Sequence, residues 1–419
     1  MFSKNQNQNT EKAGGSVMEN FAKPQKPMFQ KSDKKSRTKS LLTLVLIALV
    51  FIAPFVFQGF GQIFMVRVLA VVGLYIILAL GLNIVVGYAG LLDFGHIAFY
   101  AVGAYVAMIV GTPVAKLLGS TFGGLSYFIA LPAGGLVAAC VGLLLGLPVL
   151  RLRGDYLAIV TLAFGEIVRI CLTNNIFGIT NGASGLPAAG QALPDPFGLA
   201  WLKLHTYFTI GDNFVFTFTS NVYWYIIIAV LILVAIVVVR RQDDSRLGRS
   251  WAALREDDVA ASAMGVDLTK AKLYAFALGA FWGGIAGVTF SYFQAFVSPE
   301  SFTFLESSLV LAIVIIGGMG SIPGVLVGAF VIQGIPEFIR GIASSGLLDS
   351  IGIHLSAEKI SDISSYRMLI LGALMVFMMA VRPEGIFPSK RLARELHHIE
   401  AVPVVESPTE NAVDETLEN

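Results

Sequence analysis

The sequence predicts an all-α integral membrane protein with about ten transmembrane helices. Hydrophobic residues make up 55% of the 419 residues and charged residues only 14%, whereas soluble domains carry about 25% charged residues. The charges gather in two tails and a few short loops, with long apolar runs between them. A soluble fold would need a polar surface over all its elements, so this distribution indicates that membrane lipid surrounds the chain.

Two polar tails are expected to flank a single transmembrane domain. Residues 1–40 are polar and contain more lysine and arginine than acidic residues, which predicts a disordered basic tail. Residues 41–389 hold the apolar runs, and residues 390–419 form a polar C-terminal tail. The positive-inside rule predicts that both termini are cytoplasmic, because the residues that follow the last span are also basic.

Two features decide the number of spans. The eighth and ninth runs form one apolar stretch that residues 317–324, rich in glycine and proline, interrupt, so it is either one long helix or two short ones. An even number of spans keeps both basic ends on one side, and Gly and Pro are poor in a helix interior, so two helices are expected. The candidate spans lie near residues 41–58, 63–86, 91–110, 126–149, 156–173, 222–239, 271–293, 300–317, 321–339 and 365–381.

Polar residues within the spans are candidates for a transport pathway, because such residues are costly in lipid. Asn83, Asp93 and His96 flank a glycine-rich join between the second and third spans, which is either a tight interfacial turn or a gate. Glu166 and Arg169 lie three residues apart on one predicted helix, so they are expected to pair. That pair would support helix packing or line the pathway.

A long charged loop at residues 240–272 is predicted to hold a short helix that binds a protein partner. Ser250 is the expected helix cap and Gly265 the expected stop. The acidic run at residues 256–258 would be repelled by anionic lipid, which favours a protein surface as the partner. The apolar residues that helical spacing places on one face are Trp251, Leu254 and Ala261.

Several kinds of chemistry have no counterpart in the sequence. It contains no GxxxxGK[ST] motif, so any ATP that powers transport would have to be hydrolysed by another subunit. It contains no HExxH, GxSxG or Cys/His constellation, and Cys140 and Cys171 lie in apolar runs as expected of packing residues. The chain is therefore expected to be a transport subunit rather than an enzyme, with no cofactor, metal or nucleic-acid partner.

Long stretches of the chain resemble the LivM-type permease subunits of branched-chain amino acid ABC importers. They are residues 81–105, 147–170, 248–265 and 298–320, together with the Arg-Pro-Glu-Gly motif at 382–385. Such long runs, spread over residues 80–385, are far more specific than one short motif.

The resemblance implies a fold like that of the vitamin B12 importer class of ABC permeases, in a bacterial inner membrane, with the pathway between two permeases. It implies as partners a LivH-type permease subunit, two cytoplasmic ATPase subunits and a periplasmic substrate-binding protein that delivers leucine, isoleucine or valine. It also implies that the charged loop contacts the ATPases. The residues of that ATPase-coupling loop would be Trp251, Ala252, Ala253, Leu254, Arg255, Glu256, Asp257 and Gly265.

One segment departs from the family pattern. Where relatives often have Thr-Gly-Gly-x-x-Gly, this chain has Thr-Asn-Gly-Ala-Ser-Gly at residues 180–185, and Asn181 and Ser184 complete the candidate pathway residues. The departure leaves the substrate open, so the same machine carrying urea, short amides or other amino acids is the alternative. An ion-coupled secondary transporter that uses buried acids, or a membrane-embedded enzyme, is less favoured.

Overall fold

The computed structural model describes residues 52–57, 63–122, 125–149, 152, 154–176, 178–187, 208–209, 215–216, 220–338, 367–382 and 385–387. Contacts divide the chain into two units, residues 1–53 and 54–419. The predicted tails at 1–40 and 390–419, and most of the predicted span at 41–58, lie outside the described residues.

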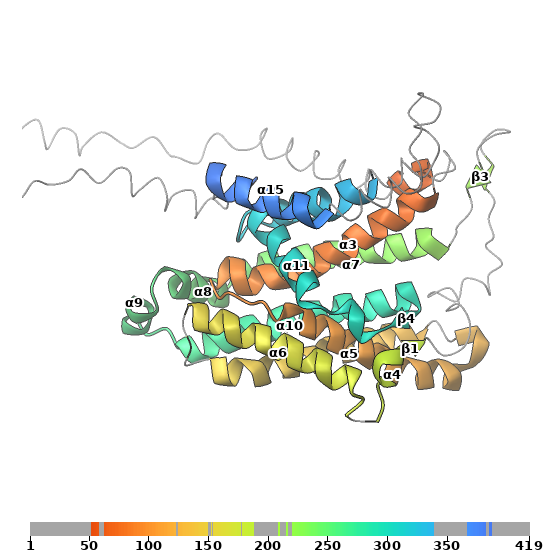
Figure 1. The fold of residues 1–419 in the computed structure, drawn as a ribbon, viewed down its shortest axis with the longest axis horizontal. Helices are drawn as coiled ribbons and strands as arrows, with labels where there is room; N and C mark the ends of the chain where they lie inside the picture. Colours follow the sequence, from red (N-terminus) through yellow and green to blue (C-terminus); the bar gives the residue numbers. More distant parts are fainter. Residues whose placement is uncertain are drawn as a thin grey trace, which may run out of the picture. The chain divides into compact units, whose positions relative to one another are not determined.

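Long helices form most of the described part of the second unit (Figure 1). Between them lie two π-helical turns, η1 and η4, two 3₁₀ turns, η2 and η3, and four strands of two residues each. Strand β1 pairs antiparallel with β4, and β2 with β3. The elements are α3 (Ile63–Asn83), η1 (Ile84–Tyr88), α4 (His96–Phe122), α5 (Leu125–Val149), α6 (Asp155–Thr173), η2 (Gly182–Ser184), β1 (Leu186–Pro187), β2 (Phe208–Thr209), β3 (Val215–Phe216), α7 (Ser220–Asp243), α8 (Arg246–Glu256), α9 (Asp258–Ala263), α10 (Leu268–Gln294), β4 (Phe296–Val297), η3 (Pro299–Ser301), α11 (Phe304–Gly317), α12 (Ile322–Ala329), η4 (Phe330–Gly334) and α15 (Arg367–Val381).

Seven helical stretches in the described residues are long and apolar enough to cross a membrane, which confirms the predicted fold class. A shorter apolar helix covers Ile322–Phe338, and the fifteen-residue α15 lies where the last span was predicted. The number ten stays a prediction, because the first predicted span is largely outside the described residues. The seven stretches are Phe64–Tyr88, His96–Leu117, Leu125–Pro148, Asp155–Thr173, Asn221–Asp243, Leu268–Gln294 and Pro299–Gly317.

Large apolar side chains are exposed along α5, α6 and α7. Leu144 of α5 is 65% exposed, Ile159 of α6 is 62% exposed and Val237 of α7 is 51% exposed. So much exposed apolar surface would be unfavourable in water but is favourable against lipid chains or another apolar subunit. These helices therefore form an apolar outer surface of the bundle.

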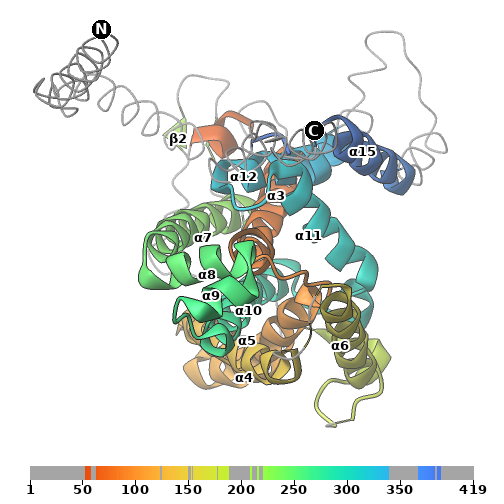
Figure 2. The same ribbon diagram turned by 90° about the vertical axis from the view of Figure 1, so that its left-hand side faces the viewer.

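Helix α10 is the centre of the packing, with α3, α4 and α5 against it (Figure 2). Glycines bring these backbones close together, since a Cβ atom added to Gly103 of α4 would collide with the backbone of Gly284 of α10. A Cβ atom added to Gly287 would collide with the Tyr100 carbonyl in the same way. Membrane helices gain van der Waals contact from such small residues, because lipid supplies no hydrophobic drive between them.

Hydroxyl groups also join α5 to α10. The Tyr292 hydroxyl donates a hydrogen bond to Ser126 Oγ at 3.0 Å, and the Tyr127 hydroxyl lies 3.1 Å from Thr289 Oγ1. Each buried hydroxyl thus has a partner, as a low-dielectric interior requires. Contacts of this kind hold the two helices in one register.

The apolar stretch that includes residues 317–324 forms two helices, as predicted. Helix α11 ends at Gly317, and Gly318 and Gly320 have φ values of 116° and 75°, a conformation that glycine adopts at little cost. Ser321 then caps α12, with its Oγ accepting a hydrogen bond from Gly324 N at 3.3 Å. The glycines therefore make the turn, and the serine begins the next helix.

Two predicted boundaries were wrong. The third span begins at His96, because residues 91–95 are not helical, and its helix, α4, runs on to Phe122. The charged loop covers only residues 244–267, because α7 continues to Asp243 and α10 begins at Leu268. Asp267 caps α10, and the hydrogen bond from Lys270 N holds the pKa of this carboxyl below its usual value. Helices α4, α7 and α10 thus extend beyond the apolar spans that were predicted for them.

We expect Gly103→Leu to destabilise the bundle by about 3 kcal/mol, because overpacking a tight contact forces backbones apart. Gly372→Leu is the matched control, since a Cβ atom at Gly372 of α15 would meet nothing within 4 Å. The fraction of protein that remains monodisperse on size exclusion after stepwise heating in detergent measures the effect. Equal losses in the two variants would contradict a tight contact between α4 and α10.

Candidate functional site

Residues 89–95 connect η1 to α4 without forming a helix, and most of them are buried or partly buried, whereas Gly90 is exposed. Ala89, Leu91 and Asp93 are at most 7% exposed. Side chains of neighbouring helices satisfy the backbone: Phe94 N donates to Thr161 Oγ1 at 3.0 Å, and Ser307 Oγ donates to the Phe94 carbonyl. Non-helical backbone inside a membrane protein is tolerated where protein buries it or where it lines a wet cavity. Here protein buries most of it.

Asp93 and His96 form a fully buried polar pair at the start of α4. Asp93 Oδ1 accepts a hydrogen bond from Gly95 N at 2.8 Å, and Asp93 Oδ2 lies 3.5 Å from His96 Nδ1, without hydrogen-bond geometry. The other face of the imidazole packs against glycines: Cβ atoms added to Gly81 and Gly283 would lie 3.2 and 3.4 Å from His96 Nε2. His96 is therefore enclosed where α3, α4 and α10 meet.

Several buried polar atoms near this junction have no partner among the described residues. They are Asn83 Nδ2, His96 Nδ1 and Nε2, Asp93 Oδ2 and Trp282 Nε1. Unpaired buried polar atoms are costly, and they occur where water, an ion or a second conformation satisfies them. The predicted pathway residues Asn83, Asp93 and His96 thus all lie in buried positions at one end of α3 and the start of α4.

Two hydrogen bonds join the π turn η1 to distant parts of the chain. Asn83 Oδ1 accepts a hydrogen bond from Gly320 N at 2.9 Å, which joins η1 to the α11–α12 turn. Arg255 Nη1 donates to the Gly87 carbonyl at 2.8 Å, which joins η1 to α8. Single π turns in membrane helices often mark functional positions. This one connects the charged loop to the buried interior.

The charged loop folds as two helices rather than the one predicted. The cap of α8 is Ser245, whose Oγ accepts from Leu247 N at 3.1 Å, so the predicted cap Ser250 was wrong. Ser250 instead lies within α8 and donates to the Arg246 carbonyl. Asp257 leaves the helix with φ −161° and caps α9 through Val259 N and Ala260 N.

The apolar face predicted for this loop is confirmed. Trp251, Leu254 and Ala261 are at most 4% exposed, and Trp251 Nε1 donates to the Ala271 carbonyl at 2.9 Å, which fastens α8 to α10. Ala252 and Ala253 are partly buried, whereas Glu256 and Asp257 are exposed. Gly265 has φ +83° and ends the α9 segment as predicted. The loop thus presents an acidic edge outward and an apolar face inward.

A cleft of about 370 Å³ lies beneath these two helices, where residues 89–92 meet α8 and α9. Lys272 forms a partly buried ion pair there, with Nζ 3.1 Å from Asp258 Oδ2. The cleft also includes Leu152 and Gly154, just before α6. The charged loop, the 89–95 segment and the start of α6 therefore meet at one place.

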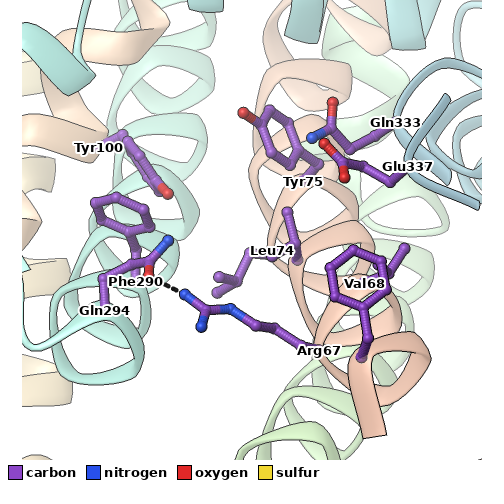
Figure 3. A pocket seen from close by; sticks show the side chains of 11 residues that line it. Arg67, Val68, Leu74, Tyr75, Tyr100, Phe290, Gln294, Gln333 and Glu337 are labelled. Atoms are coloured by element: carbon purple, nitrogen blue, oxygen red, sulfur yellow. Dashed lines mark hydrogen bonds between the residues drawn. The ribbon is translucent and has the colours of Figure 1, made fainter. Parts of the chain in front are cut away.

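A second cleft, of about 470 Å³, lies between α3 and α10, and we call it the α3–α10 cleft (Figure 3). Arg67 extends from α3 toward α10, and its Nη2 donates to Gln294 Oε1 at 3.0 Å. Tyr75, Gln333 and Glu337 lie together at another end of the cleft (Figure 3). None of these residues was among the predicted site residues, because each stands alone in an apolar run and only the folded bundle brings them together.

The remaining predicted pathway residues lie apart from the buried junction. Arg169 Nε and Glu166 Oε2 are 2.8 Å apart, so the predicted pair is confirmed, but each side chain is 32% exposed. No described contact joins this pair to Asp93 or His96. The pair lies on a partly exposed flank of α6, which fits its support of helix packing.

Asn181 and Ser184 belong to a structured turn after α6, and both are exposed. Asn181 has φ +57°, and its Nδ2 donates to the Gly185 carbonyl at 2.8 Å. Asparagine tolerates this left-handed conformation better than other residues with a side chain. That explains how this chain carries asparagine where the family pattern has glycine.

Comparison with known proteins gives a consistent result. Residues 64–379 match the family described as "Branched-chain amino acid transport system / permease component". The permease protein LivM of Salmonella typhimurium, from its high-affinity branched-chain amino acid transport system, is 38% identical over 87% of this chain and 82% of its own length. LivM of Escherichia coli is 41% identical over 76% of this chain and 68% of its own.

A second type of permease is also similar. The permease protein LivH of Escherichia coli, named for the same transport system, is 25% identical over 74% of this chain and 90% of its own length. No solved structure matches the chain. Because the family match covers well over half of the chain, and LivM proteins match it at 38–41% identity, this multi-spanning membrane protein belongs to the family of branched-chain amino acid transport system permeases.

Proposed function

We propose that this chain is the permease subunit of an ATP-binding-cassette importer that moves branched-chain amino acids into the cytoplasm. The observation that carries the proposal is its 38% identity to a LivM permease over 87% of its length. The fold agrees, because the described residues include seven membrane-length helices, and a buried polar junction among α3, α4 and α10 is linked to an exposed charged loop. The sequence has no P-loop of its own, so another subunit supplies the ATPase.

The importer contains three further kinds of subunit. A LivH-type permease is the second membrane subunit, since LivH is itself similar to this chain. Two ATPases bind the permease pair on the cytoplasmic side, and this chain contributes α8 and α9, where Glu256 and Asp257 form the exposed acidic edge. A periplasmic binding protein delivers the substrate on the other side. The chain lies in the bacterial inner membrane with both termini in the cytoplasm, and residues 41–389 form the permease domain.

Movement of the ATPases reaches the pathway through α8. Trp251 fastens α8 to α10, and Arg255 fastens it to η1. A shift of α8 therefore pulls directly on the Gly87 carbonyl. Because Asn83 also holds Gly320, the same shift reaches the α11–α12 turn. The cytoplasmic part of the pathway would open or close through these contacts.

The complete importer in proteoliposomes should take up leucine when ATP is inside, and the purified chain alone should show no ATPase activity. Radiolabelled uptake and phosphate release are the two measurements. ATP hydrolysis by the chain alone would contradict the division of labour between subunits. Uptake of urea or short amides without leucine would contradict the proposed substrate and support the alternative cargo.

Arg255→Gln should uncouple hydrolysis from transport. The charge-assisted bond to the Gly87 carbonyl is worth about 1.5–3 kcal/mol, and glutamine does not reproduce it. We expect leucine uptake per ATP hydrolysed to fall about tenfold, the factor that about 1.4 kcal/mol gives. Arg240→Gln removes the same charge from an exposed position on α7 and should have no effect. Normal coupling in Arg255→Gln would show that this contact transmits nothing.

Glu256→Lys should abolish uptake while the basal hydrolysis of the ATPases persists, because it reverses charge on the edge proposed to bind them. Asp257→Asn separates charge from helix capping, since asparagine caps α9 as well as aspartate. We expect Asp257→Asn to lose part of the coupling without loss of thermal stability. If hydrolysis in Glu256→Lys stays fully stimulated by loaded binding protein and uptake is normal, the ATPases bind elsewhere.

A further inference from the structure

The α3–α10 cleft combines a cation, acceptor groups and apolar walls in one cavity (Figure 3). Its volume, about 470 Å³, falls in the range of about 300–1,000 Å³ that is usual for small-ligand sites. None of its lining residues belongs to the buried junction around His96 or to the charged loop. The ligand of this cleft is therefore indicated by the side chains that line it.

The cation is Arg67, at one side of the cleft. Its guanidinium donates to Gln294 Oε1 at 3.0 Å and lies 5.8 Å from the centre of the Phe293 ring. An amide and a ring hold it in place without neutralising its charge. A guanidinium offers five donors in a planar fork that matches a carboxylate. This side of the cleft therefore suits an anionic group.

The acceptors lie at another end, on η4 and on the helical residues that follow it. Gln333 is only 5% exposed, and its Oε1 has no hydrogen-bond partner among the described residues. Glu337 lies beside it (Figure 3), and Tyr75, which also lines this end, donates a hydrogen bond to Glu306 Oε2 at 2.6 Å. An unpartnered buried carbonyl beside a carboxylate suits an ammonium group, which has donors only.

Apolar side chains of α3 and α10 form an apolar wall of the cleft. They are Val68, Val71, Leu74 and Phe290. Such a wall favours an aliphatic group over a polar one, because burying a polar group without a partner is costly.

We propose that this cleft binds the transported amino acid as a zwitterion on its way through the permease. Arg67 binds the carboxylate, Gln333 and Glu337 bind the ammonium, and the apolar wall contacts the branched side chain. The inference rests on the proposed function and adds a selective site within the membrane subunit itself. It would also place the substrate beside η4, the second π turn of the fold.

The test measures direct binding by the complete transporter in nanodiscs, without ATP or binding protein. The probes are [³H]leucine, competed by 3-methylbutylamine, which lacks the carboxylate, and by 4-methylpentanoate, which lacks the ammonium. Arg67→Gln should raise the Kd of leucine at least tenfold and leave that of 3-methylbutylamine unchanged. Gln333→Met, which removes the amide at similar size, should raise the Kd of leucine but not that of 4-methylpentanoate.

Two further variants are controls for general damage to the fold. Lys116→Gln removes a positive charge from an exposed position on α4 and should bind leucine as the wild type does. Arg67→Lys keeps the charge and should recover part of the lost affinity. Each variant must elute as the wild type does on size exclusion.

The possible results of these experiments distinguish a failure of the proposed binding site from a failure of the proposed function. If the wild-type importer takes up leucine but the nanodisc complex does not bind it, or if Arg67→Gln binds it unchanged, the site is wrong and the function stands. If Arg67→Gln weakens the binding of leucine and of 3-methylbutylamine equally, the effect is structural and the proposed site is likewise overturned. If the wild-type importer takes up no leucine at all, the proposed function itself fails.

Discussion

Backbone N–H and C=O groups inside a lipid bilayer need partners within the protein, and the central region of this molecule depends on that requirement. Residues 89–95 leave the helical pattern, so their backbone needs other partners. Thr161 and Ser307 bind the backbone of Phe94, and glycines allow the helices to close around the segment. Helix α10 is able to pack so near α3 and α4 because Gly103 and the glycines of α10 remove the side chains that would separate them. The non-helical segment is therefore tolerated only because tight helix packing surrounds it.

The same segment explains how an exposed loop can act on a buried region. The last carbonyls of a helix have no partner within it, and Gly87 is the next-to-last residue of η1, so its carbonyl accepts a bond from Arg255 of α8. Asn83, one turn earlier, uses its amide oxygen to hold the backbone of Gly320. The end of this helix is thus attached to two other parts of the chain, and a change at one is felt at the other.

Sequence reasoning predicted what depends on composition and local chemistry. Long apolar runs predicted the spans, and the glycines near residue 318 predicted the turn between α11 and α12. The spacing of Trp251 and Leu254 predicted the buried face of α8. It failed where a tertiary contact or a competing local hydrogen bond determines the structure. Both Ser245 and Ser250 are good helix caps, and α7 ends early enough in the loop for the first of them to be used. Residues of the α3–α10 cleft were missed because they come from α3, α4, α10 and η4, and no spacing along the chain relates them.

The charged residues of the α3–α10 cleft lie on apolar helices, and an unpaired charge at the centre of a span costs about 2.5–3.5 kcal/mol on insertion scales. Arg67 lies near the start of the stretch Phe64–Tyr88, and its side chain is exposed. The partners of Arg67 are the Gln294 amide and the Phe293 ring, which orient a guanidinium but do not cancel its charge. The carboxylate of Glu337 lines another end of the same cavity. A ligand with both a carboxylate and an ammonium group would complement the two ends, and its aliphatic side chain would contact the apolar wall, as in an aliphatic amino acid.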